Sequence, residues 1–354
     1  MNWQVDSVTS VPEVSVRTPW ETPPAQGEAI EVAEGVLWMR QPLPMKLDHV
    51  NVYALDDGDS WTIVDTGFST RKSRAIWDEL IAGPLKGKPI RRVVATHHHP
   101  DHIGLAGWFQ SDHGCELVTT RTAWLFARML TLDVQEEWPA ETLAYYRSAG
   151  MDSAIYEQRA KDRPFNFADT VYPMPLGFTR IKQGDVFRMG GRDWDVHIGN
   201  GHAPEHATFW SRDDNLVITG DQILSSISPN IGVYATEPMA DPLADWLEAC
   251  ERLLQLARPD HLALGGHKLP FARLPLRMRQ LIDNHHGALE RLLDHLDKPM
   301  SAAECFSPLF KRRIGTGEYG LALVEAVAHV NHLYCIGQVT RTRRDDGAWL
   351  YQRK

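Results

Sequence analysis

Short apolar runs recur through the first three quarters of the chain, and several of them end in histidine, aspartate or glycine. Runs of this kind predict buried strands, and they occupy residues 28–40, 48–55, 61–67, 91–95, 185–198, 215–219 and 261–264. Asp57-Gly58 is a tight-turn signal within this series. Helical periodicity at residues 69–80 and 241–257 predicts helices packed on the resulting sheets. The sequence therefore predicts an α/β fold with mixed sheets.

A segment of different character interrupts this pattern at residues 121–178. It is rich in aromatic residues and methionine, and apolar positions such as Leu125, Met129 and Leu132 have helical spacing. We expect an inserted helical layer in this place. Its function would be that of a lid or pocket wall shaped for an apolar acyl group. The alternative is that its aromatic residues only attach the insertion to the main fold or form a dimer contact.

After Pro275 the pattern changes again, to helix, helix, helix and hairpin. Long helices are predicted at residues 276–296 and 319–336, a Ser301-to-Glu304 capping box opens a short helix between them, and residues 338–352 form the hairpin. We divide the chain accordingly into an N-terminal arm (1–27), a main domain that contains the insertion (28–275) and a small α+β C-terminal domain (276–354).

Composition narrows the class of protein. The 354 residues are 43% hydrophobic and 23% charged, which is ordinary for a soluble globular protein. A net charge of −9 does not attract nucleic acid or an anionic membrane. The four cysteines are far apart and form no CxxC pair, which favours a reducing compartment. We see no secretory leader and no apolar run of membrane-spanning length, so the expectation is a cytoplasmic enzyme that does not bind membranes.

The densest chemistry lies in the segment Thr-His-His-His-Pro-Asp-His at residues 96–102, directly after an apolar run. Side chains two apart on an extended backbone share a face, so His97 and His99 can point at one ion. Asp101 and His102 then come from the turn beyond the strand and can bind a second ion. Nitrogen and oxygen ligands without thiolate suit zinc, iron or manganese. The alternative is a polar turn with a chance run of histidines.

Three later residues each follow an apolar strand and one or more glycines. His202 follows a Gly-Asn-Gly turn, Asp221 follows a glycine, and His267 follows a Gly-Gly pair. Glycine before a ligand permits a tight loop and a close approach to an ion. Each residue alone could be an ordinary turn residue, but together they indicate one site.

The H-x-H-x-D-H pattern at a strand end, followed in order by these three residues, resembles the metallo-β-lactamase superfamily. The resemblance implies an αββα sandwich. It also implies two divalent metal ions, with zinc as the first expectation and iron or manganese as alternatives. The implied ligands are His97, His99 and His202 for one ion and Asp101, His102 and His267 for the other, with Asp221 as a bridge.

Two more residues take their roles from the same resemblance. Asp65, in a Val-Asp-Thr-Gly segment that ends a strand, would lie near the metals and orient a ligand. The alternative is that Asp65 caps the N-terminus of the next helix. His206, in a Gly-His-x-x-x-His segment, would support the ligands or the structure without binding a metal.

The resemblance also implies hydrolysis. A water shared by two cations loses its proton near neutral pH and attacks a carbonyl carbon. The leaving group is then stabilised by the second ion or protonated through Asp101. We expect the small-molecule substrate to be a hydrophobic thioester, ester or lactone. The alternatives are a metal-dependent ribonuclease of the same superfamily and a non-catalytic binding protein on the same fold.

The C-terminal segment resembles a winged-helix domain, which some superfamily members carry and which can bind nucleic acid. Residues 314–340 contain neither Lys nor Arg, so the helix at 319–336 offers no basic side chain to a phosphate. We therefore expect a structural role, a homodimer contact or a wall beside the active site, and no nucleic-acid partner.

Overall fold

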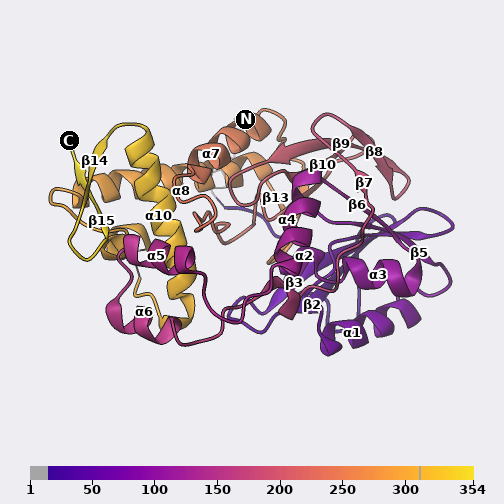
Figure 1. Ribbon diagram of the computed structural model, residues 1–354. Coiled ribbons are helices and arrows are strands. Elements are labelled where there is room, and N and C mark those ends of the chain that lie inside the picture. Colours follow the sequence, from indigo (N-terminus) through magenta and orange to yellow (C-terminus); the bar gives the residue numbers. More distant parts are fainter. Residues whose placement is uncertain (1–14, 311) are drawn as a thin grey trace, which may run out of the picture.

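Two large sheets carry the fold in the computed structural model, which describes residues 15–310 and 312–354 (Figure 1). The first sheet consists of β1 (Ile30–Ala33), β2 (Val36–Pro42), β3 (His49–Asp56), β4 (Trp61–Val64), β5 (Ile90–Val94), β6 (Glu116–Thr119) and β7 (Thr179–Arg180). Its strands pair in chain order, antiparallel from β1 to β4 and parallel from β4 to β7. The first predicted run, 28–40, is thus divided between two strands, with a turn at Gly35.

The second sheet consists of β8 (Val186–Met189), β9 (Arg192–Gly199), β10 (His206–Ser211), β11 (Leu216–Gly220), β12 (Leu262–Gly265) and β13 (Phe271–Ala272). These strands lie side by side in the order 13-12-11-10-9-8. Only β11 and β12 pair in parallel; the other pairs are antiparallel.

Alternating side chains explain why both sheets are covered on both faces. On β2, Trp38 belongs to the apolar core between the sheets and Met39 to the core under the helices. On β10, Phe209 faces the inter-sheet core and Trp210 faces outward, where it packs with Trp246 in a third core. Because successive strand residues point to opposite faces, apolar residues at consecutive positions, such as Trp38 and Met39, require cover on both sides. The result is the αββα sandwich that the sequence predicts.

Helices supply this cover. Three helices pack on the first sheet: α1 (Arg71–Ala82), α2 (Pro100–Ile103) and α3 (Ala106–His113). The helix α7 (Pro242–Leu254) covers the second sheet. Trp77 of α1 packs edge-on against Phe109 of α3, with ring centroids 4.9 Å apart, in the core under the first sheet.

The insertion predicted at 121–178 does not form a single layer. It contains α4 (Arg121–Leu132), α5 (Ala140–Ser148), α6 (Ser153–Arg159) and the 3-10 turn η1 (Phe167–Asp169). α4 and η1 pack on the core of the first sheet, whereas α5 packs into the core that holds the C-terminal helices. The molecule has two lobes, one built around the two sheets and the other around the C-terminal segment from residue 274 (Figure 1). The insertion runs from the first lobe to the second and back. Its two helical parts have different apolar partners, which the helical spacing could not indicate.

The C-terminal segment has the predicted order of elements. It contains α8 (Leu274–His295), η2 (Ala303–Cys305), α9 (Phe306–Phe310), η3 (Thr316–Glu318), α10 (Tyr319–Cys335), β14 (Val339–Arg343) and β15 (Trp349–Arg353). Half of the predicted capping box is visible, since the Ser301 N–H donates to Glu304 Oε2 at 2.6 Å. These helices share one apolar core with α7 and the outer face of the second sheet. The winged-helix resemblance and the boundary at residue 275 stay predictions.

The predicted N-terminal arm is described only from residue 15 onward; residues 1–14 lie outside the described part. Arg17 pairs with Ala272 in an isolated antiparallel bridge, and the ring of Trp20 lies 6.3 Å from that of Trp38. Among the described residues, no helix is both long and apolar enough to cross a membrane.

Candidate metal centre

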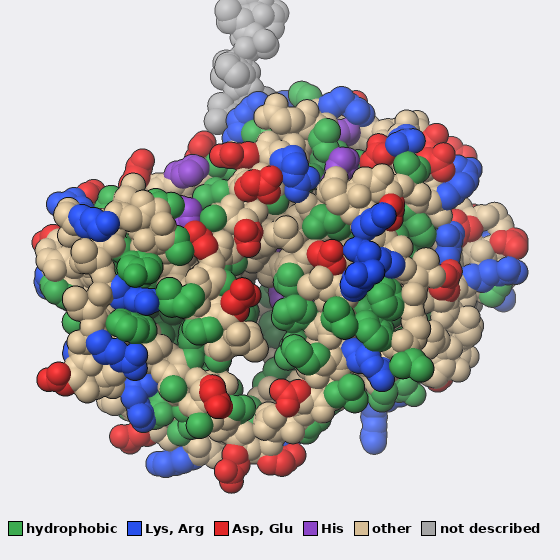
Figure 2. All heavy atoms as spheres, turned by 45° about the horizontal axis from the view of Figure 1, so that its top comes forward, with side chains coloured by type: hydrophobic (Ala, Val, Ile, Leu, Met, Phe, Trp, Pro, Cys, Tyr) green, Lys and Arg blue, Asp and Glu red, His purple; other side chains and the backbone are tan. Residues whose placement is uncertain are grey.

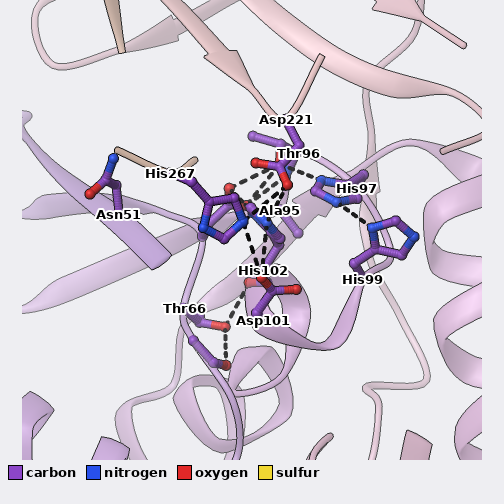
Figure 3. Close-up of polar contacts among 12 residues, drawn as sticks. Asn51, Thr66, Ala95, Thr96, His97, His99, Asp101, His102, Asp221 and His267 are labelled. Atoms are coloured by element: carbon purple, nitrogen blue, oxygen red, sulfur yellow. Dashed lines mark hydrogen bonds and ion pairs between the residues drawn. The ribbon is translucent and has the colours of Figure 1, made fainter. Parts of the chain in front are cut away.

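The seven predicted ligands converge at one end of the sandwich. His97 and His99 follow β5, His202 follows β9, Asp221 follows β11 and His267 follows β12. Among the described residues, three overlapping groups could each hold an ion: His97, His99 and His202; His97, His102 and Asp221; and Asp101, His102 and His267. Figure 3 shows most of these side chains pointing toward a common centre.

One part of the local prediction is wrong. Asp101 and His102 do not lie in a turn; they belong to the short helix α2, which begins at Pro100. Proline is favoured at the first helical position because its φ is already helical and it has no N–H to leave unpaired. The helix brings Asp101 and His102 back beneath His97, whose ring lies 4.1 Å from that of His102.

Asp221 occupies the middle of the cluster. Its Oδ2 lies 3.1 Å from His267 Nε2, 3.4 Å from His102 Nε2 and 3.6 Å from His202 Nε2. Asp101 approaches from one side only, with Oδ2 at 3.4 Å from His267 Nε2 and 3.5 Å from His102 Nε2. A single carboxylate between imidazoles of both predicted sets is the arrangement that a bridging ligand requires.

Fixed acceptors orient three of the imidazoles. The Nδ1–H of His202 donates to the carbonyl of Asn230 at 2.8 Å, and that of His267 donates to the carbonyl of His49 at 2.7 Å. His102 donates its Nδ1–H to Asp65 at 2.8 Å. A proton on Nδ1 leaves Nε2 with a free lone pair, which is the form that binds a metal. All three Nε2 atoms therefore face the centre, where they are candidate ligands.

Asp65 holds the ligand loop as well as His102. Its Oδ1 accepts the backbone N–H of Thr96 at 2.8 Å, and its Oδ2 accepts the Thr96 hydroxyl at 2.9 Å. Its φ of 59° is left-handed, a conformation that costs energy outside glycine and persists only where surrounding contacts impose it. Asp65 does not cap the next helix, because Thr70 is the N-cap of α1.

His206 lies beside the cluster and in none of the three ligand groups. Its Nε2 accepts the backbone N–H of Asp221 at 3.0 Å, and its ring stacks on that of His97 with centroids 4.6 Å apart. Burial lowers the pKa of His206 to about 3, so the imidazole is a neutral acceptor at physiological pH. The residue thus fixes the backbone of Asp221 and the ring plane of His97.

The donor set fits divalent cations. Asp221 Oδ1 and the Nε2 atoms of His102 and His202 are buried and have no hydrogen-bond partner among the described residues. Buried polar atoms of this kind are costly unless something binds them. Gly266 supports the same interpretation, because a Cβ at this position would overlap Asp221 Oδ1 and crowd His102. Imidazole and carboxylate donors without thiolate suit zinc, iron or manganese.

The electrostatics of the cluster yield a prediction about metal binding. Burial alone would lower the pKa of His267, but Asp221 and Asp101 raise it to about 10, and the carboxylates around His102 likewise raise its pKa. The His267 imidazole is therefore protonated at pH 7.5, and the carboxylates around His102 favour its protonated form, so that a bound metal competes with protons at this site. Zinc binding is expected to release protons, at least one of them from His267, and to weaken as the pH falls. Calorimetric titration in buffers of different ionisation enthalpy measures this release, and a binding heat independent of the buffer would contradict it.

Two contributors to the site carry no signal in the sequence, the carbonyls of Asn230 and His49, because any residue provides a carbonyl. His98, between two predicted ligands, is buried and belongs to none of the three ligand groups. Its ring lies 5.2 Å from that of Phe126 in α4 and stacks toward Phe167 at 6.2 Å. His98 thus connects the ligand loop to the insertion.

Comparison with known proteins agrees with this geometry. Residues 45–267 match the family model of the metallo-beta-lactamase superfamily, and residues 289–354 match that of a metallo-beta-lactamase-like C-terminal domain. The chain is 25% identical over 307 residues to the probable metallo-hydrolase YqjP of Bacillus subtilis (strain 168), covering 85% of this chain and 92% of that protein.

Two solved structures are similar over nearly the whole chain. A beta-lactamase domain protein from Burkholderia ambifaria is 35% identical with a TM-score of 0.87, covering 96% of this chain and 98% of that one. A metallo-beta-lactamase family protein from Thermus thermophilus is 28% identical with a TM-score of 0.76, covering 91% and 100%. The similarity therefore includes both lobes of the molecule.

Proposed function

Because the chain belongs to the metallo-β-lactamase superfamily, we propose that it is a metal-dependent hydrolase whose substrates are hydrophobic thioesters, esters or lactones. The family and the ligand cluster support the metallo-hydrolase class. The acyl substrate is the further step, and it rests on the exposed apolar side chains of two helices that contact the loops around the cluster. The convergence of seven candidate ligand side chains, Asp221 among them, in one cluster is the observation that carries the proposal.

The ligand roles follow from the geometry. His97, His99 and His202 would hold one ion, Asp101, His102 and His267 the other, and Asp221 would contact both. We propose zinc, since this donor set is a common one for zinc. Two divalent ions, when bound, lower the pKa of a water and polarise the carbonyl that it attacks.

Asp101 is the residue that we assign to proton transfer. Its carboxylate is 17% exposed, so it meets the cluster and the open side of the site. Burial alone would raise the pKa of Asp101, but His102 and His267 lower it, and the group is ionised at neutral pH. An ionised Asp101 can accept a proton from the attacking water at a carboxylate oxygen. It then passes that proton to the departing oxygen or sulfur.

Exposed apolar side chains occur on two helices that contact the loops of the site, α4 through Phe126 and α10 through the Leu321 carbonyl. On the insertion, Leu125 and Leu132 of α4 are 50% and 69% exposed, and neighbouring Phe126 contacts His98 beside the ligands. On the other side, Leu321 of α10 is 54% exposed, and its carbonyl accepts a hydrogen bond from Asn230. Figure 2 shows an opening between the two lobes with hydrophobic side chains on both rims. Exposed apolar side chains around a polar centre are typical of a pocket for an apolar ligand.

Truncation of this wall should weaken binding of long acyl groups. Met129 lies one helical turn after Phe126 and is 48% exposed. Met129→Ala is expected to raise KM about fivefold for a long-chain p-nitrophenyl ester, the equivalent of about 1 kcal/mol of apolar contact. KM for the acetate ester should not change. Leu256→Ala, at an exposed leucine after α7, is the matched control, and an equal effect of both variants would contradict a role for α4.

A substrate screen tests the proposed function directly. Zinc-loaded protein is assayed with p-nitrophenyl esters, acyl-CoA thioesters and lactones, and in parallel with structured RNA at low salt. The proposal predicts chelator-sensitive hydrolysis of at least one ester-type class and neither binding nor cleavage of RNA. Cleavage of RNA without ester hydrolysis would establish the ribonuclease alternative. Full zinc loading with no turnover of any substrate would favour a binding protein.

A further inference from the structure

The segment between β11 and α7, residues 221–240, carries two groups that the metal centre needs. Asp221 stands at its start, and the carbonyl of Asn230 accepts the Nδ1–H of His202. This segment, the 221–240 loop, contains no helix or strand. Its own secondary structure therefore cannot fix the Asn230 carbonyl, and contacts from elsewhere in the chain must do so.

The C-terminal helices supply these contacts. The Arg277 guanidinium of α8 donates to the carbonyls of Leu224 at 2.7 Å and Ile227 at 2.9 Å. From α10, Glu325 Oε2 accepts the side-chain amide of Asn230 at 2.8 Å. The carbonyls of α10 take part as well: Leu321 accepts the same Asn230 amide at 3.3 Å, and Val324 accepts the backbone N–H of Val233 at 3.1 Å.

These contacts form a continuous chain of hydrogen bonds from α10 to a metal ligand. Glu325 holds the Asn230 side chain, the Asn230 backbone holds His202 Nδ1, and His202 Nε2 faces His97 and His99. Both bonds of the chain measure 2.8 Å. Groups that orient a metal-bound imidazole commonly change metal affinity when they are removed.

We propose that Glu325 is a positioning residue of the metal centre, through which the C-terminal helices set the orientation of His202. The inference rests on the proposed metal centre and gives the C-terminal segment a role in it. Glu325 touches neither metal nor substrate; it acts through Asn230. Burial raises the pKa of Glu325 to about 7 while the bond from Asn230 opposes the shift, and the acceptor oxygen is present in either protonation state. Glutamine at position 325 also offers a carbonyl oxygen to the Asn230 amide, so Glu325→Gln should preserve the orientation of His202.

The same helix offers a matched control. Near its other end, His332 pairs with Asp241, the N-cap of α7, at 3.0 Å. This contact also joins α10 to the main domain, but it involves no group that touches a metal ligand. His332→Leu should lower the thermal unfolding midpoint and leave metal binding unchanged. Glu325→Leu should do both, if Glu325 is a positioning residue: lower the midpoint and weaken metal binding.

The test measures zinc affinity by competition with a chromophoric chelator, on the full-length protein. Wild type is expected to bind two zinc ions. Glu325→Leu should weaken one of the two by about tenfold, and Glu325→Gln should restore it to within about twofold of wild type. Asn230→Ala, which keeps the carbonyl but removes the amide held by α10, should match Glu325→Leu. Combining the two should add nothing further.

Several outcomes would overturn the inference. One is a folded Glu325→Leu variant whose zinc affinities stay within about twofold of wild type. Another is a double variant in which the losses of zinc affinity from Glu325→Leu and Asn230→Ala multiply. A third is a loss of zinc affinity in His332→Leu equal to that in Glu325→Leu. If Glu325→Leu does not fold, unchanged zinc affinity in Asn230→Ala decides against it. A wild-type protein that takes up no zinc would overturn the metal centre itself and the inference with it.

Discussion

Asp221→Asn is expected to abolish hydrolysis and to reduce bound metal from two ions to at most one. The Asp221 carboxylate lies within 3.6 Å of three imidazole Nε2 atoms, and no other side chain in the cluster reaches as many. The amide keeps the shape of the side chain but loses the negative charge that offsets the repulsion between two cations. A loss of several kcal/mol of transition-state stabilisation corresponds to about a thousandfold or more in kcat.

The measurement is zinc content per chain by elemental analysis, together with kcat on the best substrate of the screen. Asp195→Asn is the matched control, because Asp195 pairs with Arg212 at 2.7 Å on the surface and should keep both metal and activity when changed to the amide. Two tightly bound zinc ions and normal turnover in Asp221→Asn would remove Asp221 from the assigned role.

Asp65→Asn is expected to weaken zinc binding by about ten- to a hundredfold, although Asp65 touches no metal. Its carboxylate accepts the Nδ1–H of His102 and two hydrogen bonds from Thr96. Asparagine tolerates the left-handed backbone of this position, so the substitution isolates the loss of the acceptor from backbone strain. An amide group turned toward His102 would present an N–H to an N–H and so disfavour the tautomer that leaves Nε2 free.

Zinc competition and kcat at saturating zinc check this prediction. Asp56→Asn, at a half-buried aspartate that pairs with Lys88 at 2.6 Å, serves as the control and should leave both quantities unchanged. If Asp65→Asn held zinc as tightly as wild type, hydrogen bonding from residue 65 would not orient His102 as described.

Five of the seven candidate ligands could be located from sequence because they follow the ends of strands, and strand ends are visible as the ends of apolar runs. His97 and His99 stand two apart after β5, and Asp221 and His267 follow apolar strands with glycine before them. Glycine at 266 is required by the close approach of Asp221, so this part of the pattern reflects the site itself. Short-range patterns of this kind can be recognised in the sequence without knowledge of the fold.

What the sequence could not provide depends on contacts between distant segments. The carbonyl of Asn230 orients His202, but carbonyls carry no residue-type signal. Helical spacing at 121–178 predicted an inserted helical layer, but it could not indicate that α4 and α5 pack on different cores. The proximity of Asp65 to the ligands was one of two open alternatives, and only the pairing of β4 with β5 brings it beside Thr96.

The central claim is that these seven side chains hold a pair of cations. Anomalous diffraction from crystals grown with zinc, recorded on both sides of the zinc absorption edge, tests it most directly. The account predicts two anomalous peaks, one among His97, His99 and His202 and one among Asp101, His102 and His267, with Asp221 in contact with both. Full occupancy of zinc elsewhere, with no peak in this cluster, would contradict it.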